Sequence, residues 1–578
     1  MKFSELSVYL DKLERTSSRI EITKTLSELF IKSSGAEIDK IVYLFLGCLA
    51  PRYKGIVFNI AERMMLKALA FAYSLEKKNV TELYKRVGDL GEVAYKLSSK
   101  SGSRITDYGS LTVLSVYEKL LHIAQDEGEG SQDRKIKDMA KLLSSLDARS
   151  SKFVARIPVG KLRLGFSDKT ILDALSWMEA GDKSRKAELE AAYNVLPDVG
   201  LLAKAVKEEG IDKAVKKVKP KVGVPVLPML AQRLKSPTEM IKKMEEVAVE
   251  PKFDGLRIQI HFKRSGFNGK KDCKVKAYTR NLNENSWMFP ELESVDKHVV
   301  SDEIILDTEA IGVDEERKAL ANFQQTMTRR RKHRIEEIAS KVAIKFYVFD
   351  VLLADGKSQL KEPYLERRKV LEKTVNKSKL LEIVKYEVTK EPERINALMH
   401  QELKEGMEGI MVKRTNSRYV AGRTGWRWVK MKEEEKAKAK LVDTIDCVVL
   451  GYTRGRGRRA GFGIGQFLVG VITGQKIQTI TKVGTGLTDD QFRELKKRLS
   501  KFETKEKPKG YEVPKDLEPD YWVGPKLVVE LAADEITKSP KHTSGYALRF
   551  PRLVKFRDDK SATSATTVSE VKKLFKLQ

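Results

Sequence analysis

Lys252 has the sequence surroundings expected of a chemically reactive lysine. It follows a proline and precedes an Asp-Gly turn in EPKFDGLR, residues 250–257. VAVE before it and LRIQIHF after it have the patterns of a buried strand and an alternating strand. A lysine attacks only as the neutral amine, which burial and nearby cations favour, and Arg257 follows closely enough to share a site. Lys252 is therefore a candidate nucleophile, although from this octapeptide alone a strand with a surface lysine is the favoured interpretation.

Two acidic residues beside apolar segments are candidates for binding a metal ion. Glu309 closes the run IILDTEA, and Glu408 opens EGIMVKR. Two carboxylates that converge on Mg²⁺, or on Mn²⁺, would suit a nucleotide phosphate. An ordinary acidic residue at a strand end is an equally good interpretation of either one alone.

One aromatic residue and two lysines complete the candidate chemistry. Phe349 lies beside Asp350 in the apolar segment KFYVFDVL, where it could stack on a base or belong to a core. Lys430 and Lys432 alternate with apolar residues in WRWVKMK, which places both on one face of a strand. They could bind a triphosphate or form a solvated strand edge.

The elements that must position these residues begin with helices. From residue 1 to 220 the apolar residues have helical spacing, as at Leu6 and Leu10, which predicts an all-α domain. Residues 219–230, KPKVGVPVLPML, contain three prolines, which predicts a linker. Strands with helical insertions follow from residue 221 to 432 and predict an α/β (α+β) domain.

The last stretch, residues 433–578, follows the charged run MKEEEKAKAKL and consists of short strands, glycine-rich turns and a helical tail. This pattern predicts a β-barrel OB-fold domain. Two basic segments, KLRLG and RGRGRRAG, suit contacts with phosphates, and a solvated loop is the alternative for each. Their candidate DNA-binding residues are Lys161, Arg163, Arg454, Arg456, Arg458 and Arg459.

Composition narrows the class of partner. The 578 residues include 110 Lys and Arg against 81 Asp and Glu, a net charge of +29, so polyanions and above all nucleic acid are the expected partners.

The three cysteines lie far apart, which excludes a disulfide framework and a zinc finger. No apolar run is long enough to span a membrane, and the amino terminus lacks the apolar core of a signal peptide. We expect a cytoplasmic, nucleoid-associated protein without a membrane partner.

The order of the motifs is specific although each motif alone is weak. The series is Lys252-x-Asp254-Gly255, Tyr278-Thr279-Arg280-Asn281, Asp307-x-Glu309, Phe349-Asp350, Glu408-Gly409 and Lys430-x-Lys432. It resembles the motifs of the covalent nucleotidyltransferases. Nearly the whole chain is similar to the archaeal-type replicative ATP-dependent DNA ligases, through GVPVLPMLAQ, EPKFDGLR, EGIMVKR, GRGRRAGFG, VVELAADEITKSP and LRFPRLVKFRDDKSATSATT.

The resemblance implies an enzyme that seals nicks in duplex DNA through a lysyl-AMP intermediate, in replication, repair and recombination. Its helical domain would encircle DNA, its middle domain would be adenylated, and its OB domain would close over the nick. ATP and Mg²⁺ are the implied cofactors, and nicked double-stranded DNA and a sliding clamp are the implied partners of a monomer. Archaeal relatives often bind the clamp through a Phe pair, whereas the corresponding KSGSRITDYGS has only Tyr108.

Residue roles follow from the resemblance by position. Lys252 would attack the α-phosphate of ATP, Glu250 would lie at the adenine edge, and Phe349 would stack on the base. Relatives place an arginine directly before Gly-Trp, and Arg423, followed here by Thr424, is the candidate for its contact. The other implied sites are Arg257 and Arg280 at the ribose or phosphates, Glu309 at the ribose and metal, Glu408 at Mg²⁺, Lys430 and Lys432 at the α-phosphate, and Arg557, Asp558 and Lys560 at the pyrophosphate.

Other interpretations are less favoured. An RNA ligase or mRNA capping enzyme shares the Lys-x-Asp-Gly core, but the long helical domain and the Arg-Asp-Asp-Lys ending disfavour both. An NAD-dependent ligase is disfavoured because the cysteines of a zinc module are missing. A non-catalytic nucleic-acid clamp would be signalled by loss of the lysine or of the metal-binding acids, and all of these are present.

Overall fold

The computed structural model divides the chain into two compact units, residues 1–432 and 433–578, which are described separately. Within them it describes residues 1–100, 111–160, 162, 164, 166–234, 236–267, 269, 274–314, 319–320, 343–422, 425–432, 444–455, 461–484 and 487–577. The candidate residues Lys161, Arg163, Arg423, Arg456, Arg458 and Arg459, together with Thr424 and Tyr108, lie outside these ranges.

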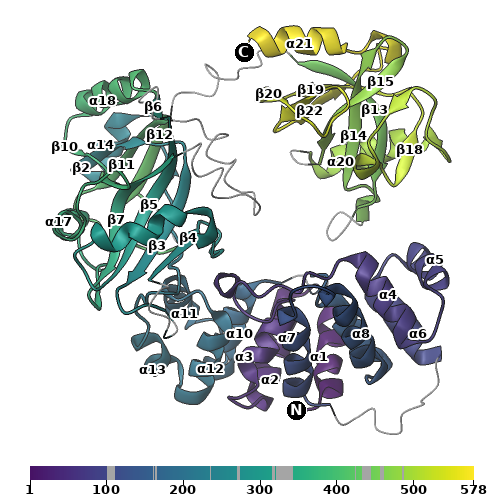
Figure 1. The fold of residues 1–578 in the computed structure, drawn as a ribbon, viewed down its shortest axis with the longest axis horizontal. Helices are drawn as coiled ribbons and strands as arrows, with labels where there is room; N and C mark the ends of the chain where they lie inside the picture. The colour runs from purple at the N-terminus through teal and green to yellow at the C-terminus, as the bar shows by residue number, and fades with distance from the viewer. Residues whose placement is uncertain are drawn as a thin grey trace. The chain divides into compact units, whose positions relative to one another are not determined.

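The first unit begins with the predicted helical domain, whose helices pack side by side in Figure 1. Helix starts follow local capping chemistry: Ser18 accepts a hydrogen bond from the backbone of Glu21, and Asp147 accepts from the backbone of Arg149. The helices are α1 (Phe3–Arg15), α2 (Arg19–Lys32), α3 (Ile38–Phe45), α4 (Glu62–Ala72), α5 (Lys77–Val87), α6 (Leu90–Lys100), α7 (Val113–Gln125), α8 (Ser131–Ser144), α9 (Ala148–Arg156), α10 (Asp168–Ala180), α11 (Lys186–Val195), α12 (Val199–Glu209) and α13 (Ile211–Lys216).

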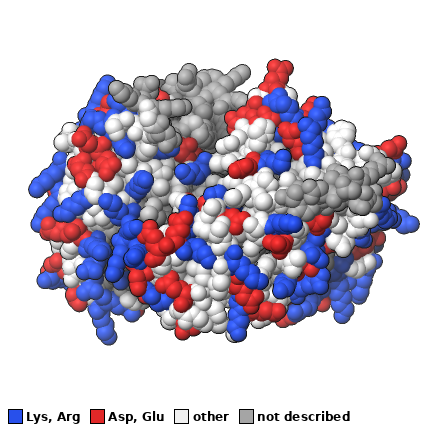
Figure 2. Space-filling view, turned by 90° about the horizontal axis from the view of Figure 1, so that it is seen from below, with Lys and Arg blue, Asp and Glu red and all other residues white. Residues whose placement is uncertain are grey.

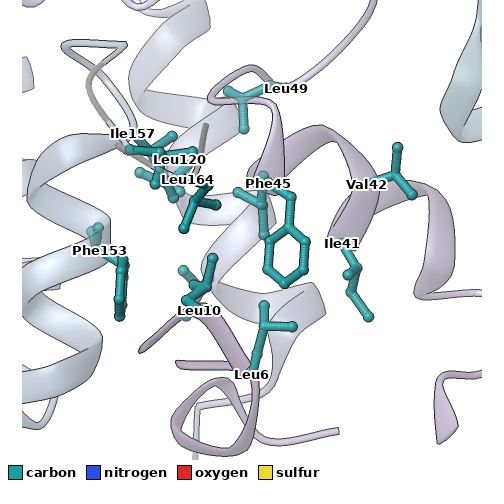
Figure 3. Packing of buried hydrophobic residues seen from close by; sticks show 14 of the residues in the cluster. Leu6, Leu10, Ile41, Val42, Phe45, Leu49, Leu120, Phe153, Ile157 and Leu164 are labelled. Atoms are coloured by element: carbon teal, nitrogen blue, oxygen red, sulfur yellow. The ribbon is translucent and has the colours of Figure 1, made fainter. Parts of the chain in front are cut away.

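The helices bury one apolar core. Leu6 and Leu10 lie one turn apart on α1 and meet Phe45 of α3 and Phe153 of α9, as Figure 3 shows. This spacing is the helical period on which the prediction of an all-α domain rested. None of the described helices is long and apolar enough to cross a membrane.

On the face shown in Figure 2, surface charge does not mark a binding site. On the side shown in Figure 2, Lys and Arg side chains are spread over the surface and interleaved with Asp and Glu. The net charge of +29 therefore predicts a polyanionic partner without indicating where it binds.

The rest of the first unit is built on two sheets that are almost wholly antiparallel, which makes this part α+β. One sheet has the order β1 (Gln232–Arg233), β12 (Trp428–Lys432), β11 (Gly409–Arg414), β2 (Val247–Lys252), β10 (Glu387–Thr389). The other has β4 (Val275–Thr279), β3 (Leu256–Lys263), β5 (Glu303–Asp314), β7 (Ala343–Ala354), β8 (Lys357–Ser358), with β6 (Ala319–Leu320) on β5 and β9 (Leu381–Ile383) on β7. The helices are α14 (Pro237–Met244), α17 (Tyr364–Thr374) and α18 (Pro392–Lys404).

The proline-rich residues 219–230, which connect the helical part to the two sheets, are hydrogen-bonded to the second sheet. Gln259 on β3 donates to Val226 O at 2.7 Å and accepts from Val226 N at 3.0 Å. His261 Nδ1 accepts from Gly223 N at 3.1 Å, and burial lowers the pKa of His261 to about 3, so the ring stays neutral and can accept. We call residues 219–230 the strap.

Replacing Gln259 by leucine is expected to loosen the strap. The change leaves the N–H and C=O of buried Val226 without partners, and each such group costs about 1–3 kcal/mol. Calorimetry should show a lower melting temperature, whereas Gln401→Leu on the exposed face of α18 should leave it unchanged. Equal melting temperatures for the two variants would contradict this account.

The second unit is rich in strands, as the sequence predicts. The strands are β13 (Ile445–Thr453), β14 (Gln466–Thr473), β15 (Lys476–Val483), β16 (Glu503–Thr504), β17 (Tyr511–Glu512), β18 (Tyr521–Val523), β19 (Val528–Ala532), β20 (Glu535–Lys538), β21 (Tyr546–Arg549) and β22 (Arg552–Phe556), with α20 (Asp489–Ser500) and α21 (Val568–Leu577). β13 is central, because it pairs with β14, β18 and β19. Within the described strands the pairings form an eight-stranded sheet and a separate hairpin, β20–β21.

Candidate functional site

A cavity of about 510 Å³ is lined by strands of both sheets of the first unit. Its size is that of a small-molecule binding site. Part of the strap, Met229 and Leu230, forms one wall. Seven of the residues predicted from the sequence line this cavity, although they are up to 180 positions apart: Glu250, Lys252, Arg257, Arg280, Glu309, Phe349 and Lys430.

Lys252 ends β2 and is held in a partly buried position. Its backbone O accepts from Glu408 N at 2.9 Å, and its Nζ donates to Glu408 Oε2 at 2.5 Å. The side chain is 19% exposed. Burial lowers the pKa of Lys252, and Arg280 lowers it further, while Glu309 and Asp254 oppose them. The neutral amine is thus easier to form here than in water.

Arg257 lies in the cavity wall with its donors already engaged. Its Nε and Nη2 donate to the two oxygens of Asp307 at 2.9 and 2.5 Å, and Nη1 donates to Met229 O at 2.9 Å. Its guanidinium lies 5.4 Å from the centre of the Phe349 ring. The cation that lowers the pKa of Lys252 is accordingly Arg280, and the expectation that Arg257 does so is not met.

Glu309 lies in the middle of β5 rather than at a strand end, because β5 continues to residue 314. It is directly opposite Arg257 on β3. Burial raises the pKa of Glu309 to about 7, although Lys252 and Arg257 act in the opposite direction. Burial therefore favours the protonated form of Glu309, and a bound cation would favour the carboxylate.

Glu408 is shared by two lysines. It directly precedes β11 and contacts Lys252 at the end of β2 and Lys432 at the end of β12. Gly409 follows it with φ +146°, and a Cβ there would meet Met431 O at 2.2 Å. Only glycine permits this close approach of β11 and β12, which places Glu408 beside Lys252.

Two carboxylates beside Lys252 fit a magnesium ion that also binds substrate. Mg²⁺ usually takes one or two carboxylates and completes its shell with water and phosphate oxygens. Glu309 and Glu408 supply two such groups, and the described residues contain no cluster of three or more His, Cys, Asp or Glu. The donor set thus suits an ion held jointly with a phosphate.

The cavity wall at Glu250 belongs to a buried polar cluster that the sequence did not reveal. Glu250, 2% exposed, is contacted by Lys413 Nζ at 2.6 Å, by the Tyr364 hydroxyl and by Arg368 at 3.9 Å. Lys413 also lies 4.8 Å from the centre of the Phe349 ring. The available signal was a lysine inside the apolar strand EGIMVKR, since a lysine is almost never buried without a partner.

The remaining predicted residues that the structure describes belong to the second unit. Arg557 and Lys560 both contact Asp446, and Asp558 accepts from Arg498 Nη1 at 2.6 Å. The backbone N of Arg454 donates to Asp520 at 2.8 Å. Lys430 in the first unit has a lowered pKa, because it is partly buried near Lys252 and Arg280.

Three family models match the chain in order. They are described as DNA ligase N terminus over residues 2–176, ATP dependent DNA ligase domain over 228–432, and ATP dependent DNA ligase C terminal region over 460–560. Together they cover most of the chain.

Curated relatives are similar over the full length. The chain is 39% identical to a "Probable DNA ligase" of Dictyoglomus turgidum, over all of this chain and 98% of that protein. It is 37% identical to "DNA ligase 1" of Methanosarcina mazei, over 99% of both, and 36% identical to a "DNA ligase" of Saccharolobus solfataricus, over 100% and 98%. A solved structure named "Pmar-Lig_Pre." has a TM-score of 0.52 and 17% identity over 96% of this chain and 99% of that one, which shows likeness of fold.

Proposed function

The chain belongs to the ATP-dependent DNA ligase family, and we propose that it seals nicks in duplex DNA by way of AMP bound covalently to Lys252. One observation carries the proposal. A partly buried lysine with a lowered pKa lies in a nucleotide-sized cavity whose lining also contains basic, acidic and aromatic side chains.

In the first step, the neutral amine of Lys252 would attack the α-phosphate of ATP and pyrophosphate would leave. Glu408 Oε2, at 2.5 Å from Lys252 Nζ, is placed to accept the amine's proton. Arg280, Lys430 and Lys432 would neutralise charge on the phosphates, since phosphoryl transfer depends mainly on positioning and electrostatic stabilisation. Arg257, paired with Asp307, would support the wall beneath the base and ribose.

Glu309 and Glu408 would hold Mg²⁺ or Mn²⁺ in this step. The ion would neutralise phosphate charge when bound. Glu309 would bind it as the carboxylate, which requires loss of the proton that burial otherwise retains. Lys252 and Lys432 would compensate Glu408 in the absence of the ion.

The adenine would lie at the end of the cavity where Glu250 and Phe349 meet. Glu250 is buried beside Lys413, so a carboxylate acceptor for the exocyclic amine of adenine is supported. Phe349 would supply the stacking surface. Val384 and Met411 also line this cavity and provide apolar surface.

Phe349→Ala is expected to raise the KM for ATP in adenylate formation by roughly 5- to 150-fold, since base–aromatic stacking contributes about 1–3 kcal/mol. Sealing of a nick that already carries a 5′-adenylate should change little. Phe253 is the matched comparison, because it lines the same cavity and stacks on Tyr347 at 4.3 Å. If Phe253→Ala raises the KM for ATP and Phe349→Ala does not, then Phe253 stacks on the adenine and the role proposed for Phe349 is wrong.

AMP would then pass to the 5′-phosphate of the nick, and the 3′-hydroxyl would displace it.

We propose that the chain has three domains, residues 1–220, 221–432 and 433–578, and that the last has an OB-fold. The protein would act as a monomer in replication, repair and recombination, with a sliding clamp as a further partner. Arg423 would contact the nucleotide. Lys161, Arg163, Arg454, Arg456, Arg458 and Arg459 would contact DNA phosphates.

Joining of a singly nicked duplex tests the proposal. ATP with Mg²⁺ should support joining, EDTA should abolish it, and NAD and ADP should support little or none in parallel reactions. A matched nicked RNA duplex serves as the second substrate. The proposal would be overturned if the protein joined the nicked RNA duplex but not the nicked DNA duplex, or if it joined DNA with NAD but not with ATP.

A further inference from the structure

Two basic side chains of the segment RDDK, residues 557–560, converge on one carboxylate. Arg557 Nη1 donates to both oxygens of Asp446 at 3.1 Å, and Lys560 Nζ donates to Asp446 Oδ2 at 2.6 Å. Asp446 is on β13 and its side chain is 12% exposed. One buried acid therefore sets the position of both cations.

A second acid, Glu530, adds to the need for a cation beside Asp446. Asp446 on β13 is directly opposite Glu530 on β19. Two like charges directly opposite each other destabilise a sheet unless a cation lies between them. Arg557 Nη1 is 3.4 Å from Glu530 Oε2, and Lys555 is also 3.4 Å from it, so the pair is compensated by cations.

The backbone of Asp446 is fixed on both sides by one residue. Thr566 N donates to Asp446 O at 2.9 Å, and Asp446 N donates to Thr566 Oγ1 at 3.0 Å. Thr566 follows residues 557–560 closely in the sequence, and it holds the backbone that carries the Asp446 carboxylate in place.

Arg557 and Lys560 also have donors that do not contact Asp446. Arg557 Nε and Nη2 donate to Asp559, which is 64% exposed. The pair is bidentate, but Asp559 is exposed to solvent, so a phosphate could compete with it for the same two donors. Lys560 has three N–H donors, and its contact with Asp446 uses one of them.

We propose that Asp446 is a positioning residue for adenylate formation: it holds Arg557 and Lys560 together so that both can engage the triphosphate, while Asp559 yields to a phosphate oxygen. This inference rests on the proposed function and on the role at the pyrophosphate that the resemblance to DNA ligases implies for Arg557 and Lys560. It assigns Asp446 to the first chemical step and not to the transfer of AMP to DNA or to sealing.

Asp446→Asn keeps the shape of the side chain and removes its charge. The rate of adenylate formation from labelled ATP should fall about 10- to 100-fold, as expected for the loss of charge-assisted hydrogen bonds. Sealing of a nick that carries a pre-formed 5′-adenylate should stay within about twofold of wild type, and Asp446→Glu should restore part of the first step. Asp490→Asn is the charge-matched control, because Asp490 pairs with Arg493 on the surface of α20 and should leave both rates unchanged.

Arg557→Ala separates the possible outcomes. If Arg557→Ala slows adenylate formation and Asp446→Asn does not, the positioning role is overturned while the proposed function stands. If Asp446→Asn slows both steps equally and lowers the melting temperature, Asp446 is a structural residue and the inference is overturned. If Arg557→Ala itself leaves adenylate formation unchanged, the proposed role of residues 557–560 fails, and the inference fails with it.

Discussion

Lys252→Ala is expected to reduce the covalent transfer of AMP from labelled ATP to background and to abolish ATP-dependent joining. The residue supplies the only bond-forming amine proposed for the first step, and loss of a nucleophile removes the covalent route entirely. The wild-type adenylate should be stable to alkali and released by acid, as expected of the P–N bond of a phosphoramidate. Gel electrophoresis of the labelled protein measures both properties.

Two controls distinguish loss of chemistry from loss of structure. Lys252→Ala should still seal a nick that carries a pre-formed 5′-adenylate and should bind nicked DNA with the salt dependence of wild type. Lys369→Ala, on an exposed face of α17, should behave as wild type in all assays. A stable label on Lys252→Ala, or no label on wild type, would rule out Lys252 as the AMP carrier.

Arg367→Met is expected to destabilise the first unit by about 3–5 kcal/mol, because it leaves a buried carboxylate without its cation. Arg367 donates from Nε and Nη2 to Asp350 at 2.7 and 2.8 Å, and both side chains are 0% exposed. Arg367 Nη1 also donates to Glu362 O and Ser417 O, so the residue joins β7 to two loops. Calorimetry of the full chain should show the loss in the transition of the first unit.

The pH dependence of this variant has a defined sign. Burial alone would raise the pKa of Asp350, but Arg367, together with Lys413 and the backbone N of Val351, more than offsets burial and holds the pKa below its usual value. Without Arg367 the pKa should rise, so the variant regains stability relative to wild type as pH falls and Asp350 takes up a proton. Adding Asp350→Asn should recover part of the loss. A gap in melting temperature that is independent of pH would contradict this account.

The strands around the nucleophile were predictable because their signals are local. Alternation in LRIQIHF and the apolar run VAVE correspond to β3 and β2, and the Asp-Gly turn between them leaves Lys252 at a strand end. The apolar segment DCVVLGYT likewise has the local pattern of a strand, and it lies on β13. Period-two patterning depends only on neighbouring residues and on one buried face, so it is visible without knowledge of the fold.

The strap and the cluster around Glu250 were not predictable in the same way. Three prolines indicate an irregular segment but not what it binds, and the partners of Val226 on β3 are 33 positions away. Lys413 is 163 positions from Glu250 in the sequence. Such pairs are created by the register of strands, and register is set by tertiary packing.

The sequence by itself determined the family, the order of helical, mixed and strand-rich parts, and Lys252 as the candidate nucleophile, because motif order and local periodicity are written along the chain. Only the tertiary structure decided that Arg280 rather than Arg257 lowers the pKa of Lys252, that Glu309 lies inside a strand, and that Asp446 gathers Arg557 and Lys560. The physical reason is that a pKa or an ion pair depends on distances between side chains. Those distances arise only when segments distant in the sequence pack together.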